Sequence, residues 1–254
     1  MYRNCCLALV WCFCLMSANL GADPITTGIL IDEMTGMHRL AELPAPHYRN
    51  LQFSSYDRRS NHPGGPDWFQ NSDGFGSEPT PNFEVVVKEP GDDGIGEYLV
   101  CDIEGPGAIE RTWTARILGN IRMYLDNNET PVYDGPAEPF FMRTYEPYLA
   151  DAGLDADDLA GALYQRDAAY CPIPFAERCR IVWIGNLKAT HFYHIQLRKY
   201  APGTAVQTFS PADLKTYADN IRRAADILRN PDQDRTPTET FTTSLEPGKR
   251  EVVW

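Results

Sequence analysis

The amino-acid sequence predicts a mainly β protein, a β sandwich or jelly roll with one helix near its C-terminus. The chain contains 20 prolines and 19 glycines, which predict many turns, and the segments between them are short and rich in strand formers. Short strands separated by turn signals are typical of sandwiches rather than of α/β sheets. The expected strands cover residues 82–88, 97–103, 108–117, 120–125, 131–133, 178–184 and 190–198.

The sharpest break between two of these strands is Gly105-Pro106-Gly107. Proline fixes φ and donates no ladder hydrogen bond, while glycine accepts backbone angles that other residues resist. We therefore expect a hard corner just after Asp102 and Glu104. Strict alternation along the next strand places four side chains on one face: Ile109, Arg111, Trp113 and Ala115. Arg111 must then reach an edge or pair with a carboxylate. We expect Trp113 and Trp183 in or near the core.

One helix is predicted over residues 211–230. Ser210-Pro211-Ala212-Asp213 supplies an N-cap, a first-turn proline and an acidic residue near the positive end of the helix. Asn230-Pro231 ends the pattern. We expect one apolar stripe to pack on the β domain: Leu214, Tyr217, Ile221 and Leu228. A second helix-like spacing lies in the N-terminal arm: Ile29, Met34, Met37, Leu40 and Leu43.

Residues 1–22 have the pattern of a secretory signal peptide. Arg3 precedes an apolar run from Cys5 to Met16, and small residues lead to Ala22. The apolar run is too short to span a bilayer comfortably. We therefore expect cleavage near Ala22 and a secreted or periplasmic protein.

The net charge of −12 argues against nucleic acid and against an anionic membrane surface as partners. Three cysteines follow the predicted signal peptide: Cys101, Cys171 and Cys179. Cys171 and Cys179 either form a disulfide or remain buried thiols. No C-x-x-C or His/Cys spacing suggests zinc, so we expect neither a metal nor another cofactor.

The best candidate site is Ser54–Arg59. Carboxylates and guanidinium groups bind sugar hydroxyls, aromatic rings pack on the C–H face of a sugar, and Tyr56, Asp57 and Arg58 supply all three types. Asp67 and Trp68 repeat the carboxylate and the ring in a long loop, and such loops are often functional. The alternative is an Asp57–Arg salt bridge that staples the N-terminal arm. Asp102 and Glu104 offer a second carboxylate pair, for which the alternative is a structural role at the corner.

Five segments in this order resemble glycoside hydrolase family 172, formerly domain of unknown function 2961. They are F-S-S-Y-D-R-R at 53–59, D-I-E-G-P-G-A-I at 102–109, I-R-M-Y-L-D at 121–126, Y-C-P-I-P-F at 170–175, and the segment 193–200. The resemblance extends over residues 25–254. It implies the first half of a double jelly roll, assembled as a homotrimer, in a protein that acts on α-linked furanosides of fructose or arabinose with retention.

The family's two catalytic glutamates lie in motifs resembling G-E-G-D-E and T-G-T-E-D-Y, within its second jelly roll. Neither motif occurs in these 254 residues, so the resemblance assigns no catalytic residue here. Glu246-Pro247-Gly248 repeats Glu89-Pro90-Gly91 and precedes Val252-Val253-Trp254. We interpret this repeat as the start of a truncated second jelly roll. The alternative is a coincidental tripeptide before a strand that closes the first sheet.

These patterns give a plan of the chain. It comprises a signal peptide (1–22), an N-terminal arm and loop (23–81), a jelly-roll β domain (82–200), a helix packing on that domain (201–231), and a linker with the start of the second jelly roll (232–254). We expect an α-furanosidase-like protein that is inactive as this chain alone. The alternative is a non-catalytic jelly-roll module for carbohydrate binding or assembly.

Overall fold

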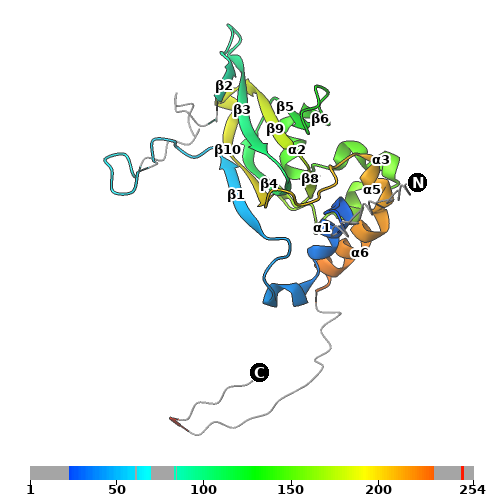
Figure 1. Ribbon diagram of the computed structural model, residues 1–254. Coiled ribbons are helices and arrows are strands. Elements are labelled where there is room, and N and C mark those ends of the chain that lie inside the picture. Colours follow the sequence, from blue (N-terminus) through cyan, green and yellow to red (C-terminus); the bar gives the residue numbers. More distant parts are fainter. Residues whose placement is uncertain (1–22, 61, 70–82, 84, 232–246, 249–254) are drawn as a thin grey trace, which may run out of the picture.

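The computed structural model describes residues 23–60, 62–69, 83, 85–231 and 247–248. Two antiparallel sheets pack as a β sandwich, and helices gather beside it (Figure 1). This arrangement confirms the predicted fold class. The first sheet contains β1 (Tyr48–Ser54), β10 (Thr190–Tyr200), β4 (Gly107–Ile117) and β7 (Ala168–Ala169), with β8 (Ile173–Phe175) also paired to β4. The second contains β2 (Val85–Lys88), β3 (Ile95–Glu104), β9 (Arg178–Asn186), β5 (Asn120–Leu125) and β6 (Tyr133–Pro136).

The strand pairs are nested along the chain. The first described strand, β1, pairs with the last, β10; β3 pairs with β9, β4 with β7 and β8, and β5 with β6. Successive members of this series alternate between the two sheets. The chain is thus one long hairpin rolled into a sandwich, which is the jelly-roll arrangement. β2 is an additional edge strand on β3.

The corner at Gly105-Pro106-Gly107 carries the chain from one sheet to the other, because it joins β3 to β4. A Cβ atom on Gly107 would lie 2.5 Å from Cζ of Phe175 and 2.7 Å from the carbonyl oxygen of Arg198. Only glycine permits this close approach of the backbone to β8 and β10. The hard corner is therefore present where the sequence predicted it.

Aromatic rings fill the space between the sheets around Trp183, which is fully buried. Its ring centroid lies 5.5 Å from that of Phe83 and 5.4 Å from that of Tyr98. The indole Nε1–H donates to the carbonyl oxygen of Leu118 at 2.7 Å. Trp183 thus occupies the predicted core position. Trp113, in contrast, is half-buried on the outer face of its sheet.

A β-bulge explains the position of Trp113. Leu197 pairs with Ile109 and Gln196 pairs with Arg111, so Glu110 is an extra residue in β4. An extra residue reverses the alternation that follows it. Beyond the bulge the buried side chains are Thr112 and Thr114, whose hydroxyls donate to the carbonyl oxygens of Phe141 and Phe192. The prediction of a single face shared by Ile109, Arg111, Trp113 and Ala115 was wrong.

The described helices are short. They are α1 (Thr27–Glu33), η1 (Met37–Ala41), α2 (Ala137–Met142), η2 (Glu146–Tyr148), α3 (Leu149–Ala152), α4 (Ala156–Leu159), η3 (Leu187–Ala189), α5 (Ala212–Thr216) and α6 (Ala218–Arg229). The predicted C-terminal helix is in fact two helices, α5 and α6, separated at Tyr217. No side chain caps α5, so the predicted N-cap by Ser210 is wrong. Leu214 and Ile221 are fully buried, as the predicted stripe required.

The C-terminal helices pack on other helices, with α5 against α3 and α6 against α1 and α4 (Figure 1). Thr27 of α1 donates a hydrogen bond to the buried Asp213 of α5 at 2.8 Å. A Cβ atom on Gly28 would lie 2.5 Å from the ring of Tyr217, so glycine lets α1 approach the junction of α5 and α6 closely. The N-terminal arm and the C-terminal helices therefore form one layer.

The N-terminal arm differs from the expectation in two ways. The helix-like spacing does not form one buried stripe: α1 buries Leu30 and Ile31, whereas three later members of the pattern are mainly exposed, Met37, Leu40 and Leu43. β1 was not predicted, although it pairs with β10 along its whole length. The sandwich therefore extends N-terminal of residue 82.

Two further sequence interpretations concern the cysteines and the C-terminus. Cys171 and Cys179 are buried and not bridged. The second Glu-Pro-Gly strand falls almost entirely outside the described residues, as does the predicted signal peptide. Among the residues that the structure describes, no helix is both long and apolar enough to cross a membrane.

Candidate functional site

The predicted site residues lie in the segment that follows β1 and runs out from the sandwich (Figure 1). Asp57 is 2% exposed. Its carboxylate accepts from Nε of Arg59 at 3.0 Å, from Nη2 at 2.6 Å and from the backbone N–H of the same residue at 3.0 Å. A bidentate guanidinium pair fixes the geometry of both groups. This contact is the Asp57–Arg salt bridge that the sequence offered as the alternative, and it is formed within the segment itself.

The other predicted sugar contacts are more accessible. Arg58 stacks over the ring of Tyr56, with Cζ 4.7 Å from the ring centre. Asp67 is exposed and Trp68 is half-buried, and the carbonyl oxygen of Trp68 accepts a hydrogen bond from the hydroxyl of Ser60. The structure leaves the sugar-contacting role of this loop as a prediction.

The acidic pair at the corner does not lie with Arg111. Both oxygens of Asp102 accept from Arg178, each at 2.7 Å, while Glu104 is exposed. Arg111 instead donates from Nη1 to Oε1 of Gln196 at 3.1 Å. Of the two alternatives for Arg111, the pairing with Asp102 or Glu104 is not found, and the amide of Gln196 on the neighbouring strand binds it instead.

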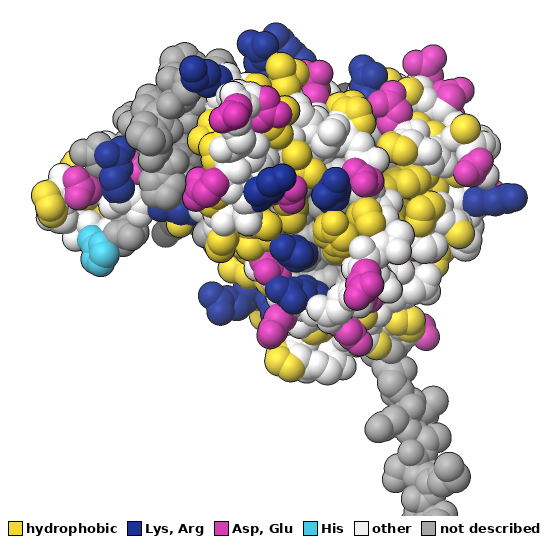
Figure 2. Space-filling model, turned by 90° about the horizontal axis from the view of Figure 1, so that it is seen from above, with side chains coloured by type: hydrophobic (Ala, Val, Ile, Leu, Met, Phe, Trp, Pro, Cys, Tyr) yellow, Lys and Arg dark blue, Asp and Glu magenta, His cyan; other side chains and the backbone are white. Residues whose placement is uncertain are grey.

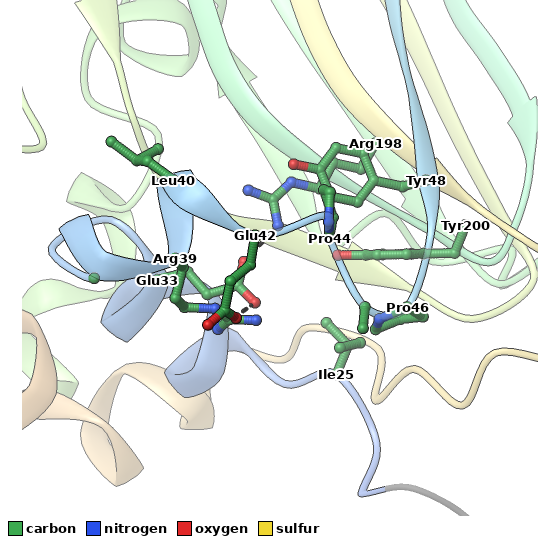
Figure 3. A pocket seen from close by; sticks show the side chains of 12 residues that line it. Ile25, Glu33, Arg39, Leu40, Glu42, Pro44, Pro46, Tyr48, Arg198 and Tyr200 are labelled. Carbon is green, nitrogen blue, oxygen red and sulfur yellow. Dashed lines mark hydrogen bonds and ion pairs between the residues drawn. The ribbon is translucent and has the colours of Figure 1, made fainter. Parts of the chain in front are cut away.

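A pocket lies where the N-terminal arm crosses the start of β1 and the end of β10 (Figure 3). The arm contributes Glu33, Arg39 and Glu42, and the sheet contributes Tyr48, Arg198 and Tyr200. Figure 3 shows the sheet's aromatic rings on one side of the pocket, while the side chain of Leu40 points away from them. The pocket is thus a junction between arm and sandwich.

Arg198 is the centre of this junction. Its Nη1 lies 2.5 Å from Oε2 of Glu33 in α1, and its Nε contacts Oε1 of Glu110 in β4. The Tyr48 ring covers the guanidinium, with its centre 4.4 Å from Cζ. One cation therefore joins α1, β4 and β10 while two carboxylates share its charge.

The junction raises the pKa of three groups: Glu110, Arg198 and Tyr200. For Arg198, burial opposes the rise in pKa, which comes from the carboxylates of Glu33 and Glu110. Burial raises the pKa of Glu110, and the charge of Glu33 adds to this, while Arg198 opposes both. Burial also raises the pKa of Tyr200 to about 12, against the opposing effect of Arg198. The environment of Glu110 beside this pocket therefore favours its protonated form.

The raised pKa of Glu110 gives a signed prediction for stability. Between its ordinary pKa and the raised one, the folded state binds more protons than the unfolded state, so this residue lowers stability as pH rises. Urea melts from about pH 4 to pH 7 should show that Glu110→Gln removes this loss. The matched control is Glu129→Gln at an exposed turn, which should follow the original protein. Parallel curves for all three proteins would contradict the prediction.

A larger groove, of about 720 Å³, lies on the outer face of β4 beyond the bulge. Arg111, Trp113 and Tyr170 line it, together with Met34 just after α1 and Leu228 of α6. Cζ of Arg111 lies 5.6 Å from the ring centre of Tyr170. The Trp113 ring packs at 4.9 Å from that of His194. Two rings and a guanidinium thus share one concave surface with aliphatic side chains.

The sequence had singled out Arg111 and Trp113 but not the groove. Both residues were assigned to the same face as Ile109, because strict alternation has no means of including the extra residue Glu110. The usable signal was the neighbouring strand, where the polar Gln196 and His194 alternate with the buried Ile195 and Leu197. That alternation places Gln196 and His194 on the outer face of β10, and these two residues pair with Arg111 and Trp113 of β4.

A comparison with models of protein families shows to which family the chain belongs. Residues 46–217 match the model of the GH172 first beta-sandwich domain. The chain belongs to glycoside hydrolase family 172. The match begins just before β1 and ends at Tyr217, so it includes both sheets, the β4 side of the groove and α5, whereas Met34 and Leu228 of the groove lie outside it. No curated protein sequence matches the chain.

Membership of a glycoside hydrolase family implies a carbohydrate ligand. On the face seen in Figure 2, basic and acidic side chains are interspersed with hydrophobic ones. The net charge of −12 is therefore not gathered into one acidic patch on that face. A neutral sugar would approach such a mixed surface without strong electrostatic attraction or repulsion.

Proposed function

We propose that this chain is the sugar-binding first sandwich of a secreted, α-furanosidase-like protein of family 172. The family match over residues 46–217 is the observation that carries this proposal. The segments that resemble the family imply α-linked furanosides of fructose or arabinose as substrates, and a homotrimer as the assembly. The signal-peptide pattern of residues 1–22 supports export.

We propose that the carboxylates of this sandwich do not carry out bond cleavage. A retaining mechanism needs a carboxylate nucleophile and a carboxylic acid about 5 Å apart. Four conspicuous carboxylates of the described chain are instead bound to three arginines: Asp57 to Arg59, Asp102 to Arg178, and Glu33 with Glu110 to Arg198. The two glutamate motifs that the resemblance associates with catalysis match no position in the sequence.

The engaged carboxylates also favour the second candidate, a non-catalytic module for carbohydrate binding or assembly. The two proposals share the binding function and differ in whether a catalytic partner domain completes the protein. Met37, Leu40 and Leu43 give the arm exposed apolar side chains, which suit a contact with another domain or copy.

The experiment is a turnover assay of the purified chain with 4-nitrophenyl α-arabinofuranoside and a difructose dianhydride. We expect no measurable turnover, because the nucleophile and the acid/base are not supplied by this sandwich. Two control variants locate any activity that does appear: Asp102→Asn/Glu104→Gln and Glu33→Gln/Glu110→Gln. Turnover that either control abolishes would overturn the proposal and place the catalytic pair at the corner or in the arm pocket.

A further inference from the structure

The groove on β4 has the chemistry of a sugar subsite. Its volume of about 720 Å³ falls within the roughly 300–1,000 Å³ that is usual for small-molecule sites. Such sites combine apolar and aromatic walls with a few polar groups that fix orientation. Here Met34, Leu228 and Trp113 supply apolar wall, while Arg111 and Asp167 supply a donor and an acceptor.

Arg111 retains unused hydrogen-bonding capacity in this groove. A guanidinium carries five N–H donors in a rigid fork. Nη1 binds Gln196, whereas the buried Nε has no hydrogen-bond partner among the described residues. A donor that is shielded from solvent and left without an acceptor is costly. Because Nε is shielded, the donor open to a ligand is Nη2, which binds no acceptor among the described residues.

The aromatic rings of the groove supply surface against which the C–H face of a sugar can pack. Trp113 is half-buried and Tyr170 is 36% exposed, so each ring keeps surface available in the groove. Tyr170 and Gln196 hold the guanidinium of Arg111 from two sides. His194 packs against Trp113. Arg111 and Trp113, which would contact the ligand, are therefore held in position by Gln196 and His194 of β10 and by Tyr170 in the β7–β8 connection.

The smaller arm pocket is a weaker candidate for the same role. Its volume is about 260 Å³, and its charged groups bind each other around Arg198. Ligand hydroxyls would have to compete with those ion pairs. The groove offers more space and a donor that the protein itself does not satisfy.

We propose that the β4 groove binds one neutral sugar residue, with the C–H face of the ring on the Trp113 indole and a ring hydroxyl accepting from Nη2 of Arg111. The groove is a binding subsite, separate from the loop of residues 55–69. The furanoside class of this sugar rests on the proposed function, but the subsite itself rests on the groove's side chains.

The test is calorimetric titration of the purified chain with α-arabinofuranosyl and β-fructofuranosyl oligosaccharides, beside a panel of neutral pyranosides. We expect Trp113→Ala and Arg111→Met each to weaken binding at least tenfold. Tyr124→Ala is the matched control, because it removes a half-buried aromatic ring from β5 of the other sheet, away from the groove and from the loop. It should bind like the original chain. Urea melts confirm that each variant is folded before it is titrated.

The outcomes separate the subsite from the proposed function. Pyranoside binding that depends on Trp113, without furanoside binding, would support the subsite and contradict the furanoside class. Absence of binding to any sugar would overturn the subsite, as would equal affinities for the original chain and both groove variants. A change in oligomeric state in the groove variants, with sugar affinity unaltered, would show that a second copy covers the groove and would also overturn it.

Discussion

The Trp183→Ala variant is expected to lose about 3–5 kcal/mol of stability, the range for removing a buried large aromatic side chain. Trp183 is fully buried between the sheets, stacks on Phe83 and Tyr98 and donates to Leu118. Alanine would leave a cavity and an unsatisfied carbonyl group. Urea melts at constant pH measure the change.

Trp113→Ala is the matched control, since Trp113 is half-buried on the outer face of the other sheet. Its cost should be clearly smaller. If Trp183→Ala does not fold, Trp183→Phe retains a ring and should give a measurable, reduced loss. A loss below about 1 kcal/mol for Trp183→Ala would show that this tryptophan does not anchor the sandwich.

The Arg198→Met variant is also expected to lose about 3–5 kcal/mol of stability, which is typical when one partner of a buried ion pair is removed. The exposed fractions of the side chains are 17% for Arg198, 15% for Glu33 and 32% for Glu110. Without the guanidinium, two carboxylates would lie close together with little solvent. The arm would lose its charged attachment to β10.

The triple variant Arg198→Met/Glu33→Gln/Glu110→Gln should recover most of this loss, because neutral groups remove the uncompensated charges. Arg178→Met is the matched control: Arg178 pairs with Asp102 but is 41% exposed, so its loss should stay near or below about 1 kcal/mol. Equal losses for Arg198→Met and Arg178→Met would contradict the role assigned to the arm junction.

The sequence predicted the sandwich because its strongest signals are local. Gly105-Pro106-Gly107 forces a corner through its backbone chemistry, and the strands at 97–103 and 190–198 carry enough strand formers to be recognised alone. β1 was missed because its residues 48–54 mix polar and apolar side chains on an edge strand. Its strand character comes from pairing with β10, which is a long-range contact.

The candidate site was harder to predict for a similar reason. Arg111 and Trp113 are conspicuous in the sequence, but the bulge at Glu110 decides which face they occupy, and a bulge depends on the partner strand. The arm junction joins Glu33, Glu110 and Arg198, whose positions in sequence are far apart. Asp57, by contrast, pairs with Arg59, which is only two residues away. The sequence had offered such an Asp57–Arg salt bridge as an alternative.

The most direct measurement of the sugar-binding role is the tryptophan indole N–H spectrum of ¹⁵N-labelled chain during titration with an α-arabinofuranosyl oligosaccharide. Trp113 lines the groove, Trp183 is buried in the core and Trp68 lies in the loop after β1, so their signals report three separate places. We expect the Trp113 signal to shift in a saturable manner while the Trp183 signal stays in place. A Trp113 signal that does not move at saturating sugar, or a saturable shift of Trp68 alone, would contradict the assignment of sugar binding to the outer face of β4.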